Sequence, residues 1–151
     1  MDALQMLEEG HDDLQAMLAK LVKEDGAPAR RLFTEMKEAL ELHEELEQTY
    51  LYPELRQDPA ARDLVLEAVE EHRVIDVLVQ EISDLKPRDE AWSPKIKVLR
   101  EIVERHIEEE GQRIFPMARN IWDADKLRHV GRWMEELKAR RRKELELVQQ
   151  Q

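Results

Sequence analysis

The sequence predicts an all-α protein, an up-down-up-down four-helix bundle followed by an additional C-terminal helix. Good helix formers dominate the composition, and the 151 residues include only four glycines. Apolar residues recur at spacings of three and four along the chain, as on one face of a helix. Turn clusters rich in Pro, Gly and Asp separate these segments, and short connections make neighbouring helices antiparallel.

Turn clusters separate the predicted helices from one another. The clusters are KEDGAP, RQDPAA, KPRDEAWSP and NIWDAD. The predicted helices therefore run near 2–24, 28–56, 60–85, 94–119 and 125–145. We expect residues 1–120 to form the bundle, and residues 121–151 to add a C-terminal helix that packs on the bundle or extends from it.

Composition excludes several classes of function. A net charge of −11 opposes binding to nucleic acid or to an anionic membrane surface. The chain has no cysteine, so disulfides and thiolate zinc sites are excluded, and a metal would need His, Asp, Glu or Tyr ligands. No apolar run reaches the roughly 18 residues of a membrane span, and nothing near Met1 resembles a signal peptide. We expect a cytoplasmic monomer or homodimer.

The chain contains one pattern twice. HEELEQTYLYP begins at His43 and HIEEEGQRIFP begins at His106, and each reads His-x-x-x-Glu, five residues, then Pro. The preceding helices also match at an offset of about sixty residues, with His11 and His72 at equivalent places on their apolar faces. Two similar helical hairpins are therefore predicted.

Six titratable side chains would then share one core, and burying them is costly unless they are paired or coordinated. Residues four apart on a helix lie side by side, so each His-x-x-x-Glu offers a nitrogen and a carboxylate that can bridge. Six ligands suit two metal ions that share carboxylates. The alternative is an interaction bundle whose histidines only hydrogen-bond to glutamates. The candidate ligands are His11, His43, Glu47, His72, His106 and Glu110.

The order His, His-x-x-x-Glu, His, His-x-x-x-Glu, with Tyr-Pro and Phe-Pro after the second and fourth, resembles the hemerythrin-like (HHE cation-binding) proteins over about residues 4–119. The resemblance implies a four-helix bundle holding two iron ions in an oxo- or hydroxo-bridged non-haem di-iron centre. It makes the four histidines terminal ligands and Glu47 and Glu110 bridging carboxylates. The expected small ligand is O2, H2O2 or NO.

Two positions depart from the oxygen-carrying members of that family. Asp76 stands where they have a fifth histidine, and Gly111 stands where they have an aspartate. Asp76 is a ligand, a hydrogen-bond acceptor for an imidazole, or only a polar residue at the edge of the bundle. Family members with the shortened ligand set and a nearby tyrosine look more like peroxide-reacting or nitric-oxide-handling proteins than oxygen carriers. The resemblance therefore implies peroxide decomposition or related redox chemistry, with non-catalytic binding or sensing of O2, NO or iron as the alternative.

A tyrosine is the remaining candidate ligand. At 100° per residue Tyr50 returns to the face of His43 and Glu47, whereas Tyr52 points away, and Arg113 takes the place of Tyr50 in the second copy. A Tyr50 phenolate would complete the ligand set, although a buried tyrosine is more often a core residue with a hydrogen-bonded hydroxyl.

Overall fold

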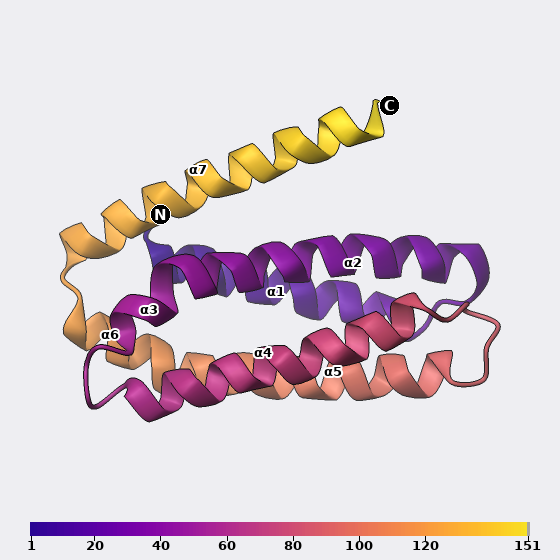
Figure 1. Cartoon of the computed structure of the whole chain (residues 1–151), viewed down its shortest axis with the longest axis horizontal. Helices are drawn as coiled ribbons and strands as arrows, with labels where there is room; N and C mark the ends of the chain where they lie inside the picture. The colour runs from indigo at the N-terminus through magenta and orange to yellow at the C-terminus, as the bar shows by residue number, and fades with distance from the viewer. Residues whose placement is uncertain (151) are drawn as a thin grey trace.

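Helices make up the regular structure of residues 1–150, the range that the computed structural model describes. Figure 1 shows a bundle of long helical rods, with α7 lying outside them. No strand occurs within that range. The elements are α1 (Ala3–Leu21), α2 (Gly26–Leu46), the π-helical turn η1 (Glu47–Leu51), α3 (Tyr52–Leu55), α4 (Arg62–Ser83), α5 (Trp92–Glu109), the π-helical turn η2 (Glu110–Ile114), α6 (Phe115–Ile121) and α7 (Ala124–Gln149).

The predicted four-helix bundle with a fifth helix is confirmed. One rod consists of α2, η1 and α3, and corresponds to the helix predicted at 28–56. Another consists of α5, η2 and α6, and corresponds to the helix predicted at 94–119. The sequence did not predict the π-helical turns inside these rods. The division of the chain into residues 1–120 and 121–151 stays a prediction.

Local signals explain where helices begin. The carboxylate of Asp2 accepts a hydrogen bond from the backbone N–H of Gln5, and the Gln5 side chain accepts one from the N–H of Asp2, which caps α1. The Asp123 side chain caps α7 in the same way by accepting from the N–H of Lys126. Gly26 has a φ of +59°, which favours glycine, and it starts α2 directly after the first turn.

The four rods do not pack equally closely. α1 packs against both α2 and α5, and α4 packs against α5, whereas α2 and α4 approach each other less closely. α7 crosses α1 and α2 and buries Leu127, Val130, Met134 and Leu137. Its C-terminal end diverges from the bundle (Figure 1). The seam between α2 and α4 is therefore the most open side of the bundle.

A polar layer divides the core into two apolar clusters. The first contains Leu7 of α1 and Leu46 of α2, and the second contains Leu14 of α1 and Leu40 of α2. On α1 and α4 the boundary between the clusters falls at a histidine, for example at His11 between Leu7 and Leu14. Apolar packing on both sides therefore holds the histidine layer in place.

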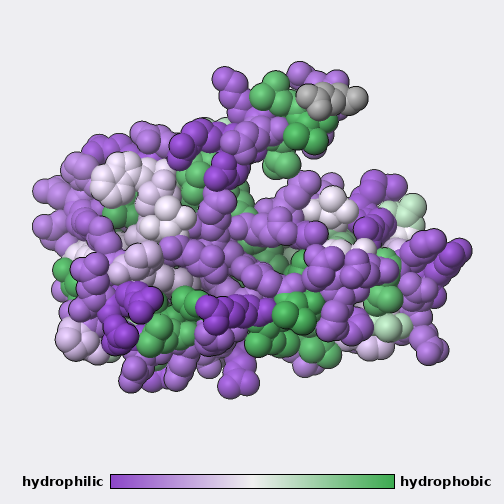
Figure 2. Space-filling view, viewed as in Figure 1, coloured by the Kyte–Doolittle hydropathy of each residue, from purple (hydrophilic) through white to green (hydrophobic). Residues whose placement is uncertain are grey.

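The visible surface is mostly hydrophilic (Figure 2), as expected for a chain in which 39% of residues are charged. Among the described helices, none has a stretch that is both long and apolar enough to cross a membrane.

Candidate metal centre

Four helices and two π-helical turns bring the six predicted ligands together. His11 lies on α1, His43 on α2, His72 on α4 and His106 on α5. The two glutamates are the first residues of η1 and η2. Each of the six side chains is at most 6% exposed. The sequence-predicted residues therefore meet in one buried layer, midway along the bundle.

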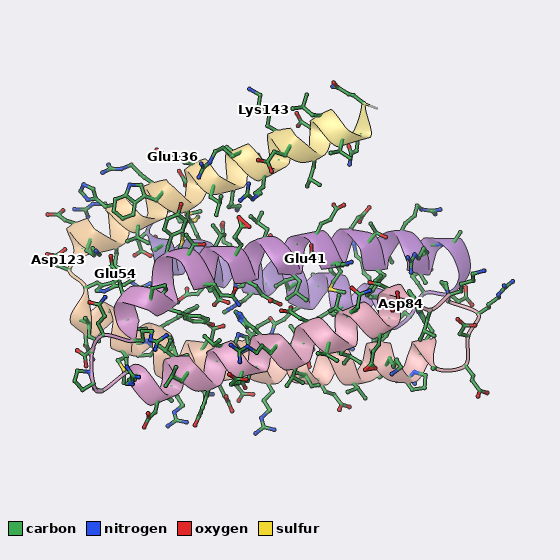
Figure 3. All side chains as sticks on the ribbon, viewed as in Figure 1. Glu41, Glu54, Asp84, Asp123, Glu136 and Lys143 are labelled. Carbon is green, nitrogen blue, oxygen red and sulfur yellow. The ribbon has the colours of Figure 1, made fainter. Side chains whose placement is uncertain are left out.

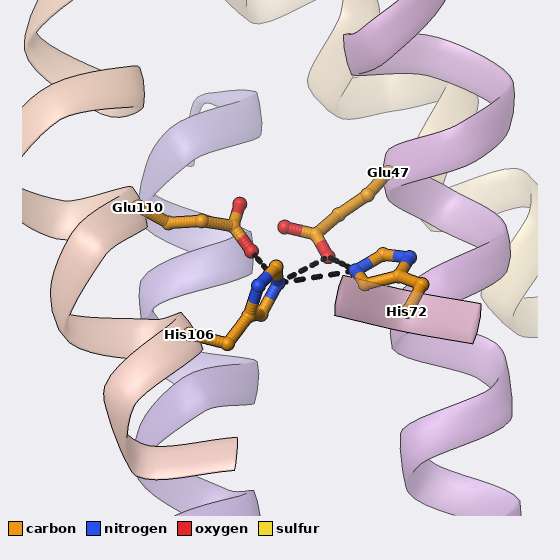
Figure 4. A group of neighbouring side chains, drawn as sticks. All are labelled: Glu47, His72, His106 and Glu110. Atoms are coloured by element: carbon orange, nitrogen blue, oxygen red, sulfur yellow. Dashed lines mark hydrogen bonds and ion pairs between the residues drawn. The ribbon is translucent and has the colours of Figure 1, made fainter. Parts of the chain in front are cut away.

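One group of four ligand atoms comes from Glu47, His72, His106 and Glu110 (Figure 4). Nε2 of His72 lies 3.2 Å from Oε1 of Glu47 and 3.1 Å from Nε2 of His106. Nε2 of His106 contacts Oε1 of Glu110 and lies 4.0 Å from Oε1 of Glu47. Two imidazoles and two carboxylates thus converge on one small volume, as the ligands of a metal ion do.

A second group comes from His11, His43 and Glu47. Nε2 of His43 lies 3.6 Å from Oε1 of Glu47, and Nε2 of His11 lies 4.0 Å from Oε2. Glu110 also approaches this group, because its Oε1 is 3.8 Å from Nε2 of His11. Glu47 belongs to both groups, so the arrangement has the form of two adjacent sites joined by a shared carboxylate.

The hydrogen bonding of this layer fits metal ligation. Nε2 of His11, Nε2 of His43 and both oxygens of Glu47 and Glu110 are buried, yet none has a hydrogen bond of acceptable geometry to another group of residues 1–150. Buried polar atoms are nearly always satisfied, and leaving one unsatisfied costs about 1–3 kcal/mol. Cations bound between these nitrogens and oxygens would satisfy all of them at once.

Prolines explain why each glutamate stands at a π-helical turn. Pro53 and Pro116 come two residues after η1 and η2. A proline inside a helix lacks an N–H and its ring collides with the carbonyl four residues earlier. One extra residue in the preceding turn removes that conflict, and such single-turn π-bulges are common at functional sites.

The extra residue also changes which tyrosine faces the ligands. Tyr50 is half-buried, and its ring lies 6.4 Å from that of Trp133 on α7, outside the cluster. Tyr52 is buried, with its hydroxyl oxygen 3.4 Å from Nε2 of His72. The expectation that Tyr50 faces the ligands and Tyr52 points away was therefore wrong. Arg113, expected on the same face in the second copy, is exposed.

Phe115 occupies the place of Tyr52 in the second half of the chain. Its ring stacks on that of His11, with centroids 5.4 Å apart and an interplanar angle of 5°. The ring of Tyr52 lies at the same centroid distance from His72, but it adds a hydroxyl. The two halves of the centre therefore differ by one phenolic oxygen close to a ligand nitrogen.

Comparison with known proteins agrees with this geometry. The family described as the hemerythrin HHE cation binding domain matches residues 2–118. The chain belongs to this family. No curated protein matches the chain. A crystal structure of a hemerythrin HHE cation binding domain-containing protein from Mycobacterium kansasii superposes with a TM-score of 0.85 over 99% of this chain and 93% of that one, at 20% sequence identity. At that identity, the likeness shows a shared fold.

As in other metal-binding proteins, imidazoles of this HHE domain have partners on their second nitrogens, which sequence reasoning missed. Nδ1 of His106 donates to Oε1 of Glu71 at 3.0 Å. The side-chain amide nitrogen of Gln48 lies 3.0 Å from Nδ1 of His72, and a half-turn of the amide puts its oxygen there as an acceptor. Such contacts fix the ring and direct Nε2 toward a metal.

Asp76 lies outside both ligand groups. It is exposed on α4, and no hydrogen bond joins it to an imidazole of the described chain. Asp76 is therefore neither a ligand in this cluster nor a hydrogen-bond acceptor for one of its imidazoles. It instead neighbours Glu44, which the sequence analysis did not single out and which is only 6% exposed. Burial, together with Asp76, raises the pKa of Glu44 to about 9.

Without metal, the HHE cluster holds protons. Burial and the neighbouring His43 lower the pKa of His11 to about 3. Burial alone would lower the pKa of His106, but the carboxylate of Glu110 and other acids raise it to about 12. Burial and Glu47 raise the pKa of the Glu110 carboxyl well above its usual value. His106 therefore carries a proton at neutral pH that a metal must displace.

Cation binding is therefore expected to release protons. Since the pKa of His106 is raised to about 12, this imidazole is protonated at pH 7 before binding and deprotonated afterwards. Affinity should rise between pH 6 and 8, by about tenfold per pH unit for each proton released. Titrating Co2+ into weakly buffered protein with a pH indicator measures the release. Co2+ binding without any change in pH would contradict the expectation that the metal-free cluster is protonated.

Gly10 leaves space for one imidazole. A Cβ at this position of α1 would lie 2.6 Å from Nδ1 of His43, far inside van der Waals contact. We expect Gly10→Ala to displace His43 and to weaken Co2+ binding by about tenfold or more. Gly111→Ala is the matched control, because its Cβ would meet nothing within 4 Å. Equal Co2+ affinities of the two variants in a competition titration would show that His43 has room to move.

Proposed function

We propose that this chain holds two iron ions in its buried layer and decomposes hydrogen peroxide there. One ion would be held by His11 and His43 and the other by His72 and His106, with Glu47 and Glu110 between them. The observation that carries this proposal is the presence of Glu47 in both ligand groups. A carboxylate shared by two adjacent sites is the arrangement that a pair of metal ions needs.

The donor set supports a redox-active transition metal. Imidazole nitrogens and carboxylate oxygens suit iron, manganese and zinc, and the chain has no thiolate to favour a softer ion. When bound, iron would supply the electron transfer that peroxide decomposition requires. Two molecules of hydrogen peroxide give two of water and one of dioxygen, so one peroxide is oxidised and the other reduced. No further oxidant or reductant is needed.

The protein residues around the centre have two roles in this proposal. The first is to exclude bulk water and to limit the size of the ligand. A small internal cavity, with a volume of about 10 Å3, is lined by the four histidines, by two glutamates and by five apolar side chains. That space is near the minimum for one water-sized molecule. The apolar residues that line it are Leu14, Leu40, Ile75, Val103 and Ile107.

The second role belongs to Tyr52. Its hydroxyl oxygen lies 3.4 Å from the nitrogen by which His72 would bind metal, so the same ion is within reach of the phenol. Burial and the nearby Glu47 raise the pKa of Tyr52, so the hydroxyl keeps its proton in the absence of metal. A phenolate ligand favours ferric iron, which disfavours reversible dioxygen binding and supports peroxide chemistry instead.

Oxygen evolution tests the proposal. We expect protein loaded with two irons per chain to release dioxygen from hydrogen peroxide, measured with an oxygen electrode, and His43→Ala to abolish this activity. His129→Ala is the control, because His129 is exposed on α7 and lies outside both ligand groups.

A non-catalytic binder or sensor of O2 or NO is the second candidate, favoured by the small closed cavity. Protein that releases no dioxygen from peroxide, but reversibly binds O2 or NO when reduced, would replace the first proposal with this one.

A further inference from the structure

A hollow opens on the loosest seam of the bundle. It lies between α2 with η1 on one side and α4 on the other, and has a volume of about 360 Å3. Four acidic residues line it, and two of them are paired with cations: Nζ of Lys37 lies 3.9 Å from a carboxylate oxygen of Glu41, and Nε of Arg141 on α7 lies 2.7 Å from one of Glu45. The acidic residues are Glu41, Glu44, Glu45 and Asp76.

Glu44 separates this hollow from the metal centre. Glu44 and Leu40 line both the hollow and the internal cavity beside the histidines. Oε1 of Glu44 is buried without a hydrogen-bond partner in the described chain, and Oε2 lies 3.9 Å from Nδ1 of His72. The carboxyl group thus stands between the outer carboxylates and the ligand groups, with a coordinating atom unused.

Packing alone does not require an acid at this position. The equivalent residue in the second copy of the pattern is Ile107, which lines the same internal cavity and is similarly buried. An isoleucine avoids the cost of burying an unpaired carboxyl group. Glu44 therefore makes the α2 side of the centre different from the α5 side, and it does so where the seam is most open.

The charges around the hollow indicate that it would admit cations and not anions. Glu44 and Asp76 are neighbours that have no ion pair with a lysine or arginine of the described chain. A concave acidic surface concentrates cations and repels anions, which raises the rate of cation capture. Oxygen ligands of this kind can take up a partly hydrated divalent ion and release it to stronger nitrogen ligands.

We propose that the hollow between α2 and α4 is the access route for divalent cations into the metal centre, with Glu44 as the carboxylate that passes each ion inward. The inference rests on the proposed two-ion centre, because it concerns how that centre is filled. It assigns Glu44 and Asp76 to the rate of metal uptake and leaves the final ligand set unchanged.

Uptake kinetics test the route without reference to activity. Metal-free protein is mixed with Co2+ in a stopped-flow instrument, and the visible absorption of bound Co2+ gives the uptake rate and the final stoichiometry. We expect Glu44→Gln to slow uptake by about tenfold and Asp76→Asn to slow it in the same direction, with two ions bound at saturation in both. Added salt should narrow the difference in rate between Asp76→Asn and the unaltered chain.

Two further variants separate the route from general effects of charge. Glu136→Gln makes the same substitution on α7, away from the hollow (Figure 3), and we expect it to alter the rate less than twofold, on the order of ordinary scatter among surface substitutions. Glu44→Ile copies the residue of the second half, and we expect uptake at least as slow as in Glu44→Gln. Helicity by circular dichroism confirms that each variant is folded.

The uptake rates and stoichiometries of these variants support or overturn the proposed access route. Unchanged rates in Glu44→Gln and Asp76→Asn overturn the route, and so does an equal slowing in Glu136→Gln. A lowered final stoichiometry in Glu44→Gln also overturns it, because Glu44 would then be a resident ligand. Failure of the unaltered chain to bind two ions would instead reject the two-ion centre itself, so the two failures are distinguishable.

Discussion

The Glu47→Gln variant is expected to bind at most one cation per chain, where the unaltered chain binds two. Glu47 belongs to both ligand groups, and its two oxygens face nitrogens of His11, His43 and His72 at 3.2–4.0 Å. Burial alone would raise the pKa of Glu47, but His43 and other neighbours lower it well below its usual value, so the carboxylate is ionised. Glutamine keeps the shape and removes this charge.

The loss of one cation site in Glu47→Gln should appear both in the number of bound ions and in the thermal stability of the protein. A ligand that binds only the folded state stabilises it, by about 2.7 kcal/mol at a concentration 100 times its Kd. We therefore expect added Co2+ to raise the melting temperature of the unaltered chain clearly and that of Glu47→Gln much less. Glu38→Gln, at an exposed position of α2, should behave like the unaltered chain. A Glu47→Gln protein that still binds two ions would contradict the shared carboxylate.

Tyr52→Phe is expected to have the second largest effect. In the iron-loaded protein, it should remove a tyrosinate-to-iron charge-transfer band from the visible spectrum and reduce dioxygen release from peroxide by about tenfold or more. The Tyr52 hydroxyl lies 3.4 Å from Nε2 of His72, and Phe115 shows that a phenyl ring fits the equivalent place in the second half. The fold should therefore tolerate the change.

Tyr50→Phe is the matched control for that experiment. Tyr50 is half-buried against Trp133 on α7, so its loss should leave both the spectrum and the activity unaltered. A charge-transfer band that survives Tyr52→Phe and disappears in Tyr50→Phe would show that the ligand face follows α-helical rather than π-helical spacing. Melting curves of both metal-free variants check that neither effect comes from unfolding.

The histidine layer was predictable from the sequence because it obeys one regular period. His11, His43, His72 and His106 each stand on the apolar face of a helix, and the repeat places them at equivalent heights. The chain confines all of them to one layer, since the residues above and below are apolar and must pack. Helical periodicity therefore predicted both the fold and the shared layer of candidate ligands.

The orientation of the side chains that follow Glu47 and Glu110 was not predictable from α-helical periodicity. A π-helical turn adds one residue and rotates everything that follows, so a count at 100° per residue selected Tyr50 in place of Tyr52. The available signal was Pro53, which cannot continue a regular α-helix without a distortion before it. The same argument applies to Pro116 in the second half.

The signal in the sequence is weaker for the polar residues that lie next to the ligands in the structure. Glu71, Gln48 and Glu44 are polar residues beside predicted ligands or at the edge of an apolar face, where solvated side chains are the usual occupants. Their roles depend on contacts between helices, such as that of Glu71 on α4 with His106 on α5. The contrast of Glu44 with Ile107 in the repeat was one signal that the sequence did contain.

The most direct test of the central claim is the number of metal ions that each chain binds. Metal-free protein is titrated with Fe2+ under anaerobic conditions, and bound iron is measured after removal of the free ion. The shared position of Glu47 between two ligand groups predicts saturation at two irons per chain. Saturation at one iron, or no stoichiometric binding, would contradict the account.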